Sequence, residues 1–356
     1  MNKNKIFSIG LMSGTSLDGI DLVYVQFDKD NYQNFQIIAA KTFAYSKKWR
    51  KTLQKAIGFS SEKLKKIDKD YGMLLSEVIQ AFIETYDIKK VDFIASHGHT
   101  VLHQPEKGIT LQIGCGKEIA KKTKLKVVYD FRRQDVELGG QGAPLVPIGD
   151  EMLFSNYEYC LNLGGFSNIS YQKNSNRIAF DICPVNIVLN HYANKLKKDF
   201  DDKGSIASSG QINRQLLQKL NSLDFYNIQS PKSLGLEWVQ HTIFPLIDNH
   251  EKKIHTILRT FTEHIAIQIG KIIYKNNSVL ITGGGTFNSF LVDRIEFYAK
   301  NNIQLPNKKL INYKEALIFS FLGLLRIDGK INCLKTVTGA NRNHSSGTIV
   351  FHNFEI

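Results

Sequence analysis

Residues 5–25, KIFSIGLMSGTSLDGIDLVYV, constrain the fold more than any other stretch of the chain. Apolar residues at 6, 7 and 9 and again at 22, 23 and 25 predict two short buried strands. The connection between them is rich in glycine, serine, threonine and aspartate, which predicts a β-hairpin turn. Successive backbone N–H groups in such a turn can hold an anion. The hydroxyls at 13, 15 and 16 add donors, and Asp18 and Asp21 can orient water or a magnesium ion.

A single turn of this kind is more often an ordinary polar hairpin tip, but the chain repeats it. A second strand, a turn at Gly164–Asn168 and a returning strand follow at 159–175, and a third glycine turn, Gly283–Gly285, follows the strand 278–282. None of them is a P-loop, because no Gly-Lys-Ser/Thr follows the glycines. Their order along the chain predicts a two-lobed nucleotide-binding fold in which each half opens with a strand–turn–strand unit.

Composition restricts the class of protein. The 356 residues suffice for two domains, and the formal charge of +13 suits an enzyme that handles anions such as nucleotides. No nucleic-acid motif is present, and no apolar run is long enough to span a membrane. The cysteines at 115, 160, 183 and 333 have no short spacing, which argues against a zinc site or a disulfide framework and fits a reducing cytoplasm.

The remaining pattern predicts an α/β protein with two lobes. We expect lobe I to cover residues 1–150 and lobe II residues 151–330, with the C-terminal segment 331–356 returning to lobe I. Polar residues follow several of the expected strands, where open α/β sheets place their ligand sites. Strands are expected at 35–44, 91–95, 111–113, 127–129 and 177–180, and helices within 46–88 and at 117–124, 186–192, 252–275 and 315–325.

Several motifs resemble those of the anhydro-N-acetylmuramic acid kinase family, within the acetate and sugar kinase, Hsp70 and actin superfamily. The most specific is Gly10–Asp21, GLMSGTSLDGID. The resemblance covers nearly the whole chain. It also includes HGHTVLHQP at 97–105, LQIG at 111–114, DFRR at 130–133, GGQGAPLVP at 139–147, NLGG at 162–165, PKS at 231–233, GGG at 283–285 with Asn288, and TGA at 338–340.

The chain departs from the family pattern at three places. The family usually has Asp-Thr-Gly-Pro-Gly-Asn where this chain has DICPVN at 181–186, so a threonine and two glycines are replaced. A threonine is common in the family where this chain has Leu234, and a glutamine where it has His99. The altered loop either takes another path near the phosphates or never needed its glycines for contact. The second interpretation is favoured, because Asp181, Pro184 and Asn186 are retained.

The resemblance implies an actin-like (ribonuclease H-like) ATPase fold, with a mixed sheet flanked by helices in each lobe and the active site in the interdomain cleft. It implies an ATP- and Mg²⁺-dependent enzyme that opens 1,6-anhydro-N-acetylmuramic acid with water and phosphorylates O6, in cell-wall recycling. A cytoplasmic homodimer is implied, with no nucleic-acid or membrane partner. A shifted sugar or phosphate-donor preference, and a sugar- or ATP-binding protein without turnover, are the alternatives.

The family's general base falls on Asp181, which could instead be only a helix cap. His97, Arg132 and Glu315 are candidate sugar contacts, with Arg132 suited to a carboxylate. The alternatives are a surface ion pair for Arg132 and a first-turn helix acid for Glu315. The dense histidines at 97, 99 and 103 do not by themselves fix a metal geometry, so no metal ligand is assigned. Nucleotide contacts are expected from Gly14, Thr15, Ser16, Leu17, Asp18, Gly19, Ile20, Asp21, Gly164, Gly165, Asn168, Gly283, Gly284 and Gly285.

Overall fold

The computed structural model describes residues 4–14, 17–273, 277–301, 303 and 305–352. The chain divides into two compact units. Unit 1 is Met1–Leu153 with Tyr313–Ile356, and unit 2 is Phe154–Asn312. The expected boundary put residues 313–330 in the second lobe, whereas the structure places them in unit 1. The backbone is non-helical at Tyr313 (φ −121°, ψ 15°), and the helical segment after it packs on the sheet of unit 1.

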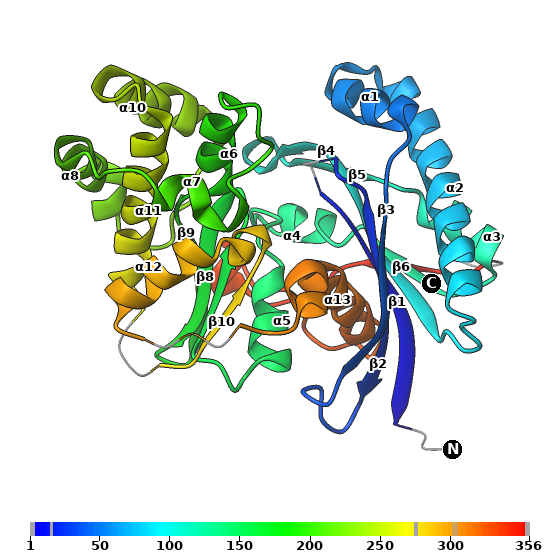
Figure 1. The fold of residues 1–356 in the computed structure, drawn as a ribbon. Coiled ribbons are helices and arrows are strands. Elements are labelled where there is room, and N and C mark those ends of the chain that lie inside the picture. The colour runs from blue at the N-terminus through cyan, green and yellow to red at the C-terminus, as the bar shows by residue number, and fades with distance from the viewer. Residues whose placement is uncertain (1–3, 15–16, 274–276, 302, 304, 353–356) are drawn as a thin grey trace. The chain divides into compact units, whose positions relative to one another are not determined.

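Unit 1 is built on a mixed sheet with the strand order β11-β6-β4-β1-β2-β3, to which β5 adds by pairing with β4. The first three strands form an antiparallel meander, and β4 lies parallel to both β1 and β6 (Figure 1). The strands are β1 Lys5–Ser13, β2 Ile20–Asp28, β3 Gln36–Phe43, β4 Phe93–Gln104, β5 Ile109–Ile113, β6 Val127–Tyr129 and β11 Thr348–Val350.

Helices cover both faces of this sheet. The buried apolar stripe of α2, which includes Leu75, Ile79 and Phe82, packs with α3 against one face. The other face receives α13, and a Cβ on Gly10 of β1 would lie 2.2 Å from the Ala316 carbonyl oxygen, so only glycine permits this approach. The helices of this part of the chain are α1 Lys47–Lys55, α2 Ser61–Thr85, α3 Gly116–Thr123, α4 Arg133–Glu137, α5 Val146–Leu153, α13 Lys308–Ile327 and α14 Lys335–Thr338.

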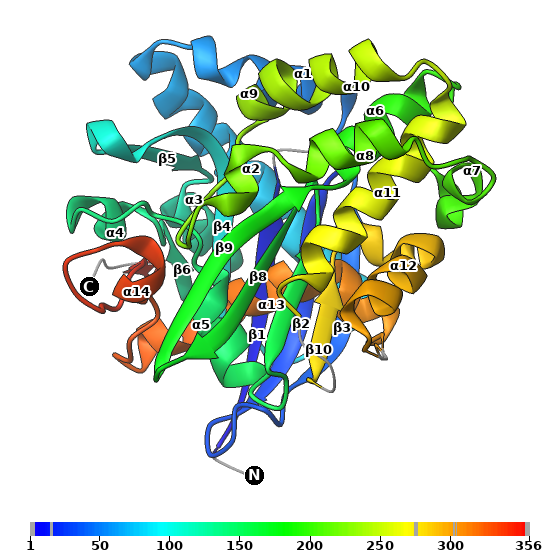
Figure 2. The same cartoon turned by 90° about the vertical axis from the view of Figure 1, so that its left-hand side faces the viewer.

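Unit 2 is built on a smaller sheet with the order β10-β7-β8-β9, seen face-on in Figure 2. Its core joins the apolar side chains of these strands to those of α6, α8, α11 and α12. The elements are β7 Tyr159–Leu163, β8 Phe166–Lys173, β9 Asn176–Pro184, β10 Val279–Thr282, α6 Asn186–Asn194, α7 Ser205–Ser208, α8 Arg214–Asn221, α9 Leu236–Trp238, α10 Phe244–His250, α11 Ile254–Gly270 and α12 Ser289–Ala299.

The two units repeat one topology. In each, an antiparallel three-strand meander (β1-β2-β3 or β7-β8-β9) receives a parallel strand (β4 or β10) beside its first strand. This duplication is that of the ribonuclease H-like, actin-like class, so the predicted α/β fold class is confirmed. The location of the active site in a cleft stays a prediction. Among the described residues, no helix combines the length and apolar character needed to cross a membrane.

Two expected strands are longer than the sequence pattern indicated. The strand expected at 91–95 continues as β4 through the histidine motif to Gln104, because β5 pairs with its second half. The strand expected at 177–180 continues as β9 to Pro184, because β8 pairs with it over that length. His97, His99 and Asp181 therefore lie within strands rather than in loops after them.

Candidate functional site

The first glycine turn connects β1 to β2 in unit 1, as the sequence predicts. Leu17 has a positive φ of 59° and donates its backbone N–H to the Gly14 carbonyl at 3.4 Å. A Cβ on Gly19 would lie 2.7 Å from the Phe43 carbonyl oxygen, so this glycine lets β3 approach the turn. Thr15 and Ser16 lie outside the described residues. Ile20, the first residue of β2, is buried. Phosphate binding by this turn stays a prediction.

The hydroxyl of Ser13 faces the core of unit 1 rather than the turn. Ser13 Oγ accepts a hydrogen bond from the Tyr71 hydroxyl at 2.9 Å and contacts the Tyr45 hydroxyl and, at 3.3 Å, His99 Nδ1. All four side chains are buried, and burial lowers the pKa of His99 to about 4. The expectation that Ser13 adds a free donor to the turn is therefore wrong. His99, which replaces the family's usual glutamine, is a neutral hydrogen-bond partner of Ser13 beneath the hairpin.

Asp21 is the better placed of the two hairpin carboxylates for a chemical role. It is half-buried, and its Oδ1 accepts a hydrogen bond from Thr42 Oγ1 at 2.6 Å. Burial raises its pKa, an effect that the Thr42 hydrogen bond opposes and the negative charge of Asp18 reinforces. Asp18 is exposed. Two carboxylates near one turn suit a hydrated divalent cation.

Three predicted sugar contacts come together in unit 1. Arg132 donates from Nε to His97 Nε2 at 2.9 Å and from Nη1 to the Gly142 carbonyl at 2.6 Å. His97 Nε2 is therefore an acceptor, and His97 Nδ1 donates to the Gly98 carbonyl at 2.9 Å, so the imidazole is neutral. Burial lowers the pKa of Arg132 to about 10, and attraction to the Glu315 carboxylate opposes that shift, so the guanidinium stays charged at neutral pH.

The structure also bears on the alternatives for these residues. Among the residues that the structure describes, Arg132 forms no ion pair, and the neighbouring Arg133 pairs with Asp130 at 3.0 Å instead. The backbone of α13 is non-helical at Tyr313 (φ −121°, ψ 15°), so Glu315 lies in the first turn of the helical segment that follows, and the first-turn alternative for Glu315 stays open. His103 contacts the Thr110 hydroxyl at 3.1 Å. Within the described part of the chain, none of the three motif histidines belongs to a group of side chains that could hold a metal ion.

In unit 2, polar side chains form a row across the sheet. Strand pairing sets Thr282 of β10 opposite Asn162 of β7, Asn162 opposite Asn168 of β8, and Asn168 opposite Asp181 of β9. Residues paired in this way point to the same face, with about 5 Å between neighbouring Cβ atoms. Asn168 is exposed, whereas Asn162 and Asp181 are half-buried. Asn162 was not a predicted site residue, although alternation along β7 and pairing to Asn168 could have indicated it.

Asp181 has the environment of a general base. Its Oδ2 accepts the Leu234 N–H at 2.9 Å, and within the described residues its Oδ1 accepts no hydrogen bond. Burial raises its pKa, and the Leu234 hydrogen bond offsets part of that rise. The helix-cap alternative fails, because α6 begins at Asn186 with Val185 at its N-cap and no side-chain cap. The catalytic role stays a prediction.

The altered family loop is the end of β9 rather than a flexible phosphate loop. Ile182, Cys183 and Val185 are buried, and none of the residues at 182–185 has a positive φ. Ile182 and Cys183 lie in the extended backbone of β9, which suits these residue types, whereas Val185 has φ −128° and ψ −98°, outside the strand and helix regions. The retained Asn186 donates from Nδ2 to the Leu163 and Gly164 carbonyls at 3.1 and 2.8 Å, which fastens the second glycine turn.

The glycines of the second and third turns differ in how much space surrounds them. Gly283 has a φ of 88°, and a Cβ there would lie 2.6 Å from Asn162 Oδ1. A Cβ on Gly285 would lie 2.8 Å from the Leu163 Cβ. Gly164, Gly165 and Gly284 have more room, with nothing nearer than 3.2 Å. The third turn is thus packed against β7, and Gly284 is left open to a ligand.

A cavity of about 400 Å³ lies beside the third turn, entirely within unit 2. Gly284, Gly285 and Asn186 form part of its wall, and Phe200 and Phe287 are exposed aromatic side chains on it. A cavity with aromatic faces beside an open glycine turn suits the base and ribose of a nucleotide. Most residues of the cavity wall were not among the predicted site residues; the wall also includes Leu189, Asn190, Asp201, Asp202, Lys203 and Asn288.

The sequence and fold were compared with those of known proteins. A family model described as anhydro-N-acetylmuramic acid kinase matches residues 6–352. The anhydro-N-acetylmuramic acid kinase of Shewanella pealeana is 33% identical over 98% of this chain and 99% of its own. That of Shewanella denitrificans is 34% identical over 96% and 97%. Among solved structures, component A of the Acidaminococcus fermentans (R)-2-hydroxyglutaryl-CoA dehydratase aligns with a TM-score of 0.47 at 15% identity, covering 88% of this chain and 96% of that one. With a full-length family match and relatives above 30% identity, the chain belongs to the anhydro-N-acetylmuramic acid kinase family, and the predicted enzyme class, a phosphotransferase, is confirmed.

Proposed function

We propose that this protein uses ATP to convert 1,6-anhydro-N-acetylmuramic acid into N-acetylmuramic acid 6-phosphate. The observation that carries the proposal is the Asp181 carboxylate. One of its oxygens is held by the Leu234 N–H, and the other accepts no hydrogen bond from the described residues. Its pKa is raised by burial. A fixed carboxylate with a free oxygen and a raised pKa is suited to take a proton from water.

The reaction couples a hydrolysis to a phosphoryl transfer. Water attacks the anomeric carbon C1, its proton goes to Asp181, and the bond from C1 to O6 breaks. The O6 released in this step takes the γ-phosphoryl group of ATP, and ADP leaves. The glycine turns and Mg²⁺ would balance the charge that moves between the phosphate oxygens. Asp18 and Asp21 are the proposed cation-facing carboxylates.

The sugar is proposed to contact His97, Arg132 and Glu315. Arg132 is held by His97 and Gly142 and stays charged, so its remaining N–H groups can bind a carboxylate such as that of the lactyl group. The nucleotide base is proposed to occupy the cavity beside Gly284. Family membership further supports a cytoplasmic homodimer with a role in cell-wall recycling.

The test is a product assay in isotopically labelled water. The protein is incubated with Mg-ATP and 1,6-anhydro-N-acetylmuramic acid in H₂¹⁸O, and the sugar phosphate is analysed by tandem mass spectrometry. We expect one phosphate on O6 and the label on C1. N-acetylmuramic acid, which is already open, serves as the control substrate. Faster phosphorylation of this open sugar, or binding of both ligands without turnover, would contradict the proposal.

A further inference from the structure

A second cluster of chemically reactive side chains lies in unit 1, outside the proposed substrate contacts. Asp135 of α4, Cys333 and His344 place a carboxylate oxygen, a sulfur and an imidazole nitrogen within 4.8 Å of one another. Their side chains are 0%, 2% and 6% exposed. A buried set of this composition needs an account of how its polar atoms are satisfied.

The backbone brings Cys333 and His344 together. Each donates its N–H to the other's carbonyl, at 3.0 and 3.2 Å, so the two residues form an isolated antiparallel bridge. Side chains directly opposite each other in such a pair point to the same face. Both side chains therefore reach Asp135.

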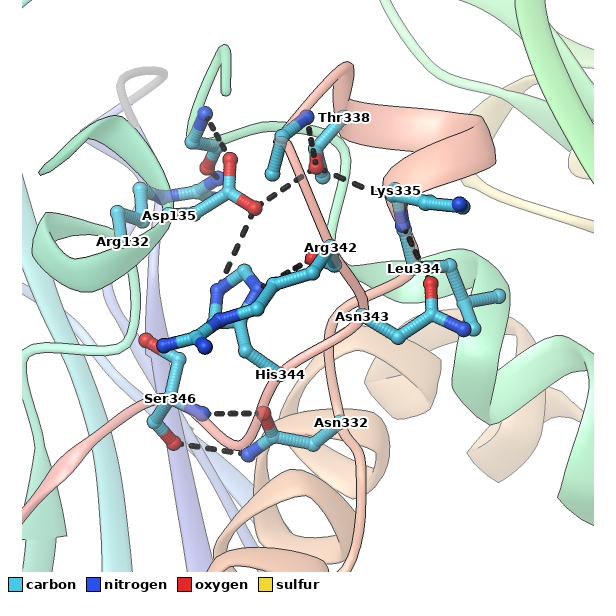
Figure 3. A network of polar contacts seen from close by, with 12 residues as sticks. Arg132, Asp135, Asn332, Leu334, Lys335, Thr338, Arg342, Asn343, His344 and Ser346 are labelled. Atoms are coloured by element: carbon cyan, nitrogen blue, oxygen red, sulfur yellow. Dashed lines mark hydrogen bonds and ion pairs between the residues drawn. The ribbon is translucent and has the colours of Figure 1, made fainter. Parts of the chain in front are cut away.

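The orientation of the His344 ring is the decisive observation. Its Nδ1 lies 3.2 Å from the Arg342 carbonyl oxygen, which can only accept, so Nδ1 carries a proton. Figure 3 shows the opposite side of the ring facing Asp135, where Nε2 lies 3.5 Å from Oδ1. His344 Nε2 is buried and makes no hydrogen bond. In the neutral ring, a nitrogen lone pair therefore faces a carboxylate oxygen, and two acceptors in contact require a cation between them.

A proton or a metal ion can supply that charge, and the geometry favours the metal. A charged N–H donor and a carboxylate oxygen usually lie about 2.7–2.9 Å apart. The 3.5 Å observed exceeds that separation, and the Cys333 sulfur adds a third ligand atom that a proton would not need. We propose that Asp135, Cys333 and His344 bind a Zn²⁺ ion, which fastens the C-terminal segment to α4.

The surrounding contacts are those of a metal site. Metal-bound histidines usually donate their other ring N–H to a carbonyl or carboxylate, as His344 does to Arg342. Bound carboxylates are held by further donors, and Asp135 accepts from the Gly142 N–H and the Thr338 hydroxyl, each at 2.7 Å. Zn²⁺ accepts this combination of sulfur, nitrogen and oxygen ligands.

Zinc binding accounts for every charge and for the proton of the thiol. The Cys333 thiol releases its proton to water as the sulfur–zinc bond forms, and the thiolate and the Asp135 carboxylate then neutralise the two charges of the ion. Since Arg132 directly precedes α4, the site would also steady this guanidinium. The proposal does not rest on the proposed kinase reaction, because metal binding is measured without substrate.

The test measures metal binding directly on the full chain. After purification, elemental analysis should give about one zinc per chain. After zinc is removed by a chelator, Co²⁺ should produce a thiolate-to-cobalt charge-transfer band. Zn²⁺ should raise the Tm of the metal-free protein.

Two variants assign the ligands. Cys333→Ser should abolish the charge-transfer band, and the matched control Cys115→Ser, at a partly exposed cysteine outside the cluster, should keep it. No stoichiometric zinc in the purified chain together with no cobalt charge-transfer band would overturn the proposal, as would an unchanged band in Cys333→Ser. Because both readouts are taken on the unmodified protein as well, a variant that fails to fold does not remove the test.

Discussion

Replacing Asp181 by asparagine separates the catalytic role of this residue from a structural one. The amide oxygen of Asn can still accept the Leu234 N–H that Asp181 Oδ2 accepts at 2.9 Å, so the local backbone should be kept. What disappears is the free carboxylate oxygen that would take the proton from water. The change therefore removes a base and almost no volume.

The expected loss of rate follows from this role. A positioned general base contributes about 10²–10⁴-fold. We expect kcat of Asp181→Asn to fall by that factor, which corresponds to about 2.7–5.5 kcal/mol of transition-state stabilisation. Nucleotide binding should remain, because the cavity beside Gly284 does not include residue 181. A coupled assay for ADP release measures kcat, and a nucleotide titration measures the Kd for the nucleotide.

Stability and pH dependence provide the internal controls. Burial raises the pKa of Asp181, so the folded protein disfavours its ionised form and stability is lost as pH rises through that pKa. Removing the carboxyl should therefore leave Tm at neutral pH unchanged or slightly higher. In the unmodified protein, kcat/KM should fall on the acid side as Asp181 is protonated, and the Asn variant should lack this limb. A variant with near-normal kcat, or a low rate accompanied by a large drop in Tm, would refute the reasoning.

Three further predictions concern the turns and the hairpin support. Gly283→Ala should lower the free energy of unfolding, measured by urea titration, by roughly 2 kcal/mol, because Gly283 has a φ of 88° and the added Cβ would lie 2.6 Å from Asn162 Oδ1. Gly284→Ala should change the free energy of unfolding by less than about 0.5 kcal/mol. Equal effects would contradict the assignment of Gly284 as the open position. Restoring the family residues with Ile182→Thr, Cys183→Gly and Val185→Gly should change kcat/KM by less than about a hundredfold. It should lower the free energy of unfolding by roughly 3 kcal/mol, because buried side chains are lost from backbone without positive φ. A larger gain in kcat/KM would show that the natural sequence impairs the site. Because the pKa of buried His99 is lowered from 6.5 to about 4, stability should fall as pH drops through this window, by up to about 3 kcal/mol from this residue. His99→Gln should reduce that slope in pH-dependent denaturation, and an unchanged slope would exclude His99 as its source.

Much of the fold was determined by local sequence. Alternating apolar residues and glycine-rich turns define the hairpin of β1 and β2, and the repeat at β7 and β8 reveals the duplicated topology. These signals are local, because a strand and its turn are specified by a few consecutive residues. The family motifs are also linear, so the enzyme class was accessible before the structure.

Tertiary pairing decided which of these residues meet. Ser13 was expected to face a ligand, but Tyr45, Tyr71 and His99 hold it in the core. Asp181 was expected after a strand, but pairing of β8 extends β9 past it and aligns it with Asn168. The three partners of Ser13 lie 32, 58 and 86 residues away from it in the sequence, so no local pattern could indicate these contacts.

The cluster at Asp135 shows most clearly the difference between what local sequence indicates and what the tertiary structure brings together. The spacing of the cysteines argued against a zinc site, because zinc sites are usually indicated in a sequence by closely spaced cysteines and histidines. The ligand atoms of Asp135, Cys333 and His344 converge because a C-terminal bridge joins two of them and returns to α4. Sequence determined the residue types available for chemistry, and the long-range return of the chain determined which of them share a site.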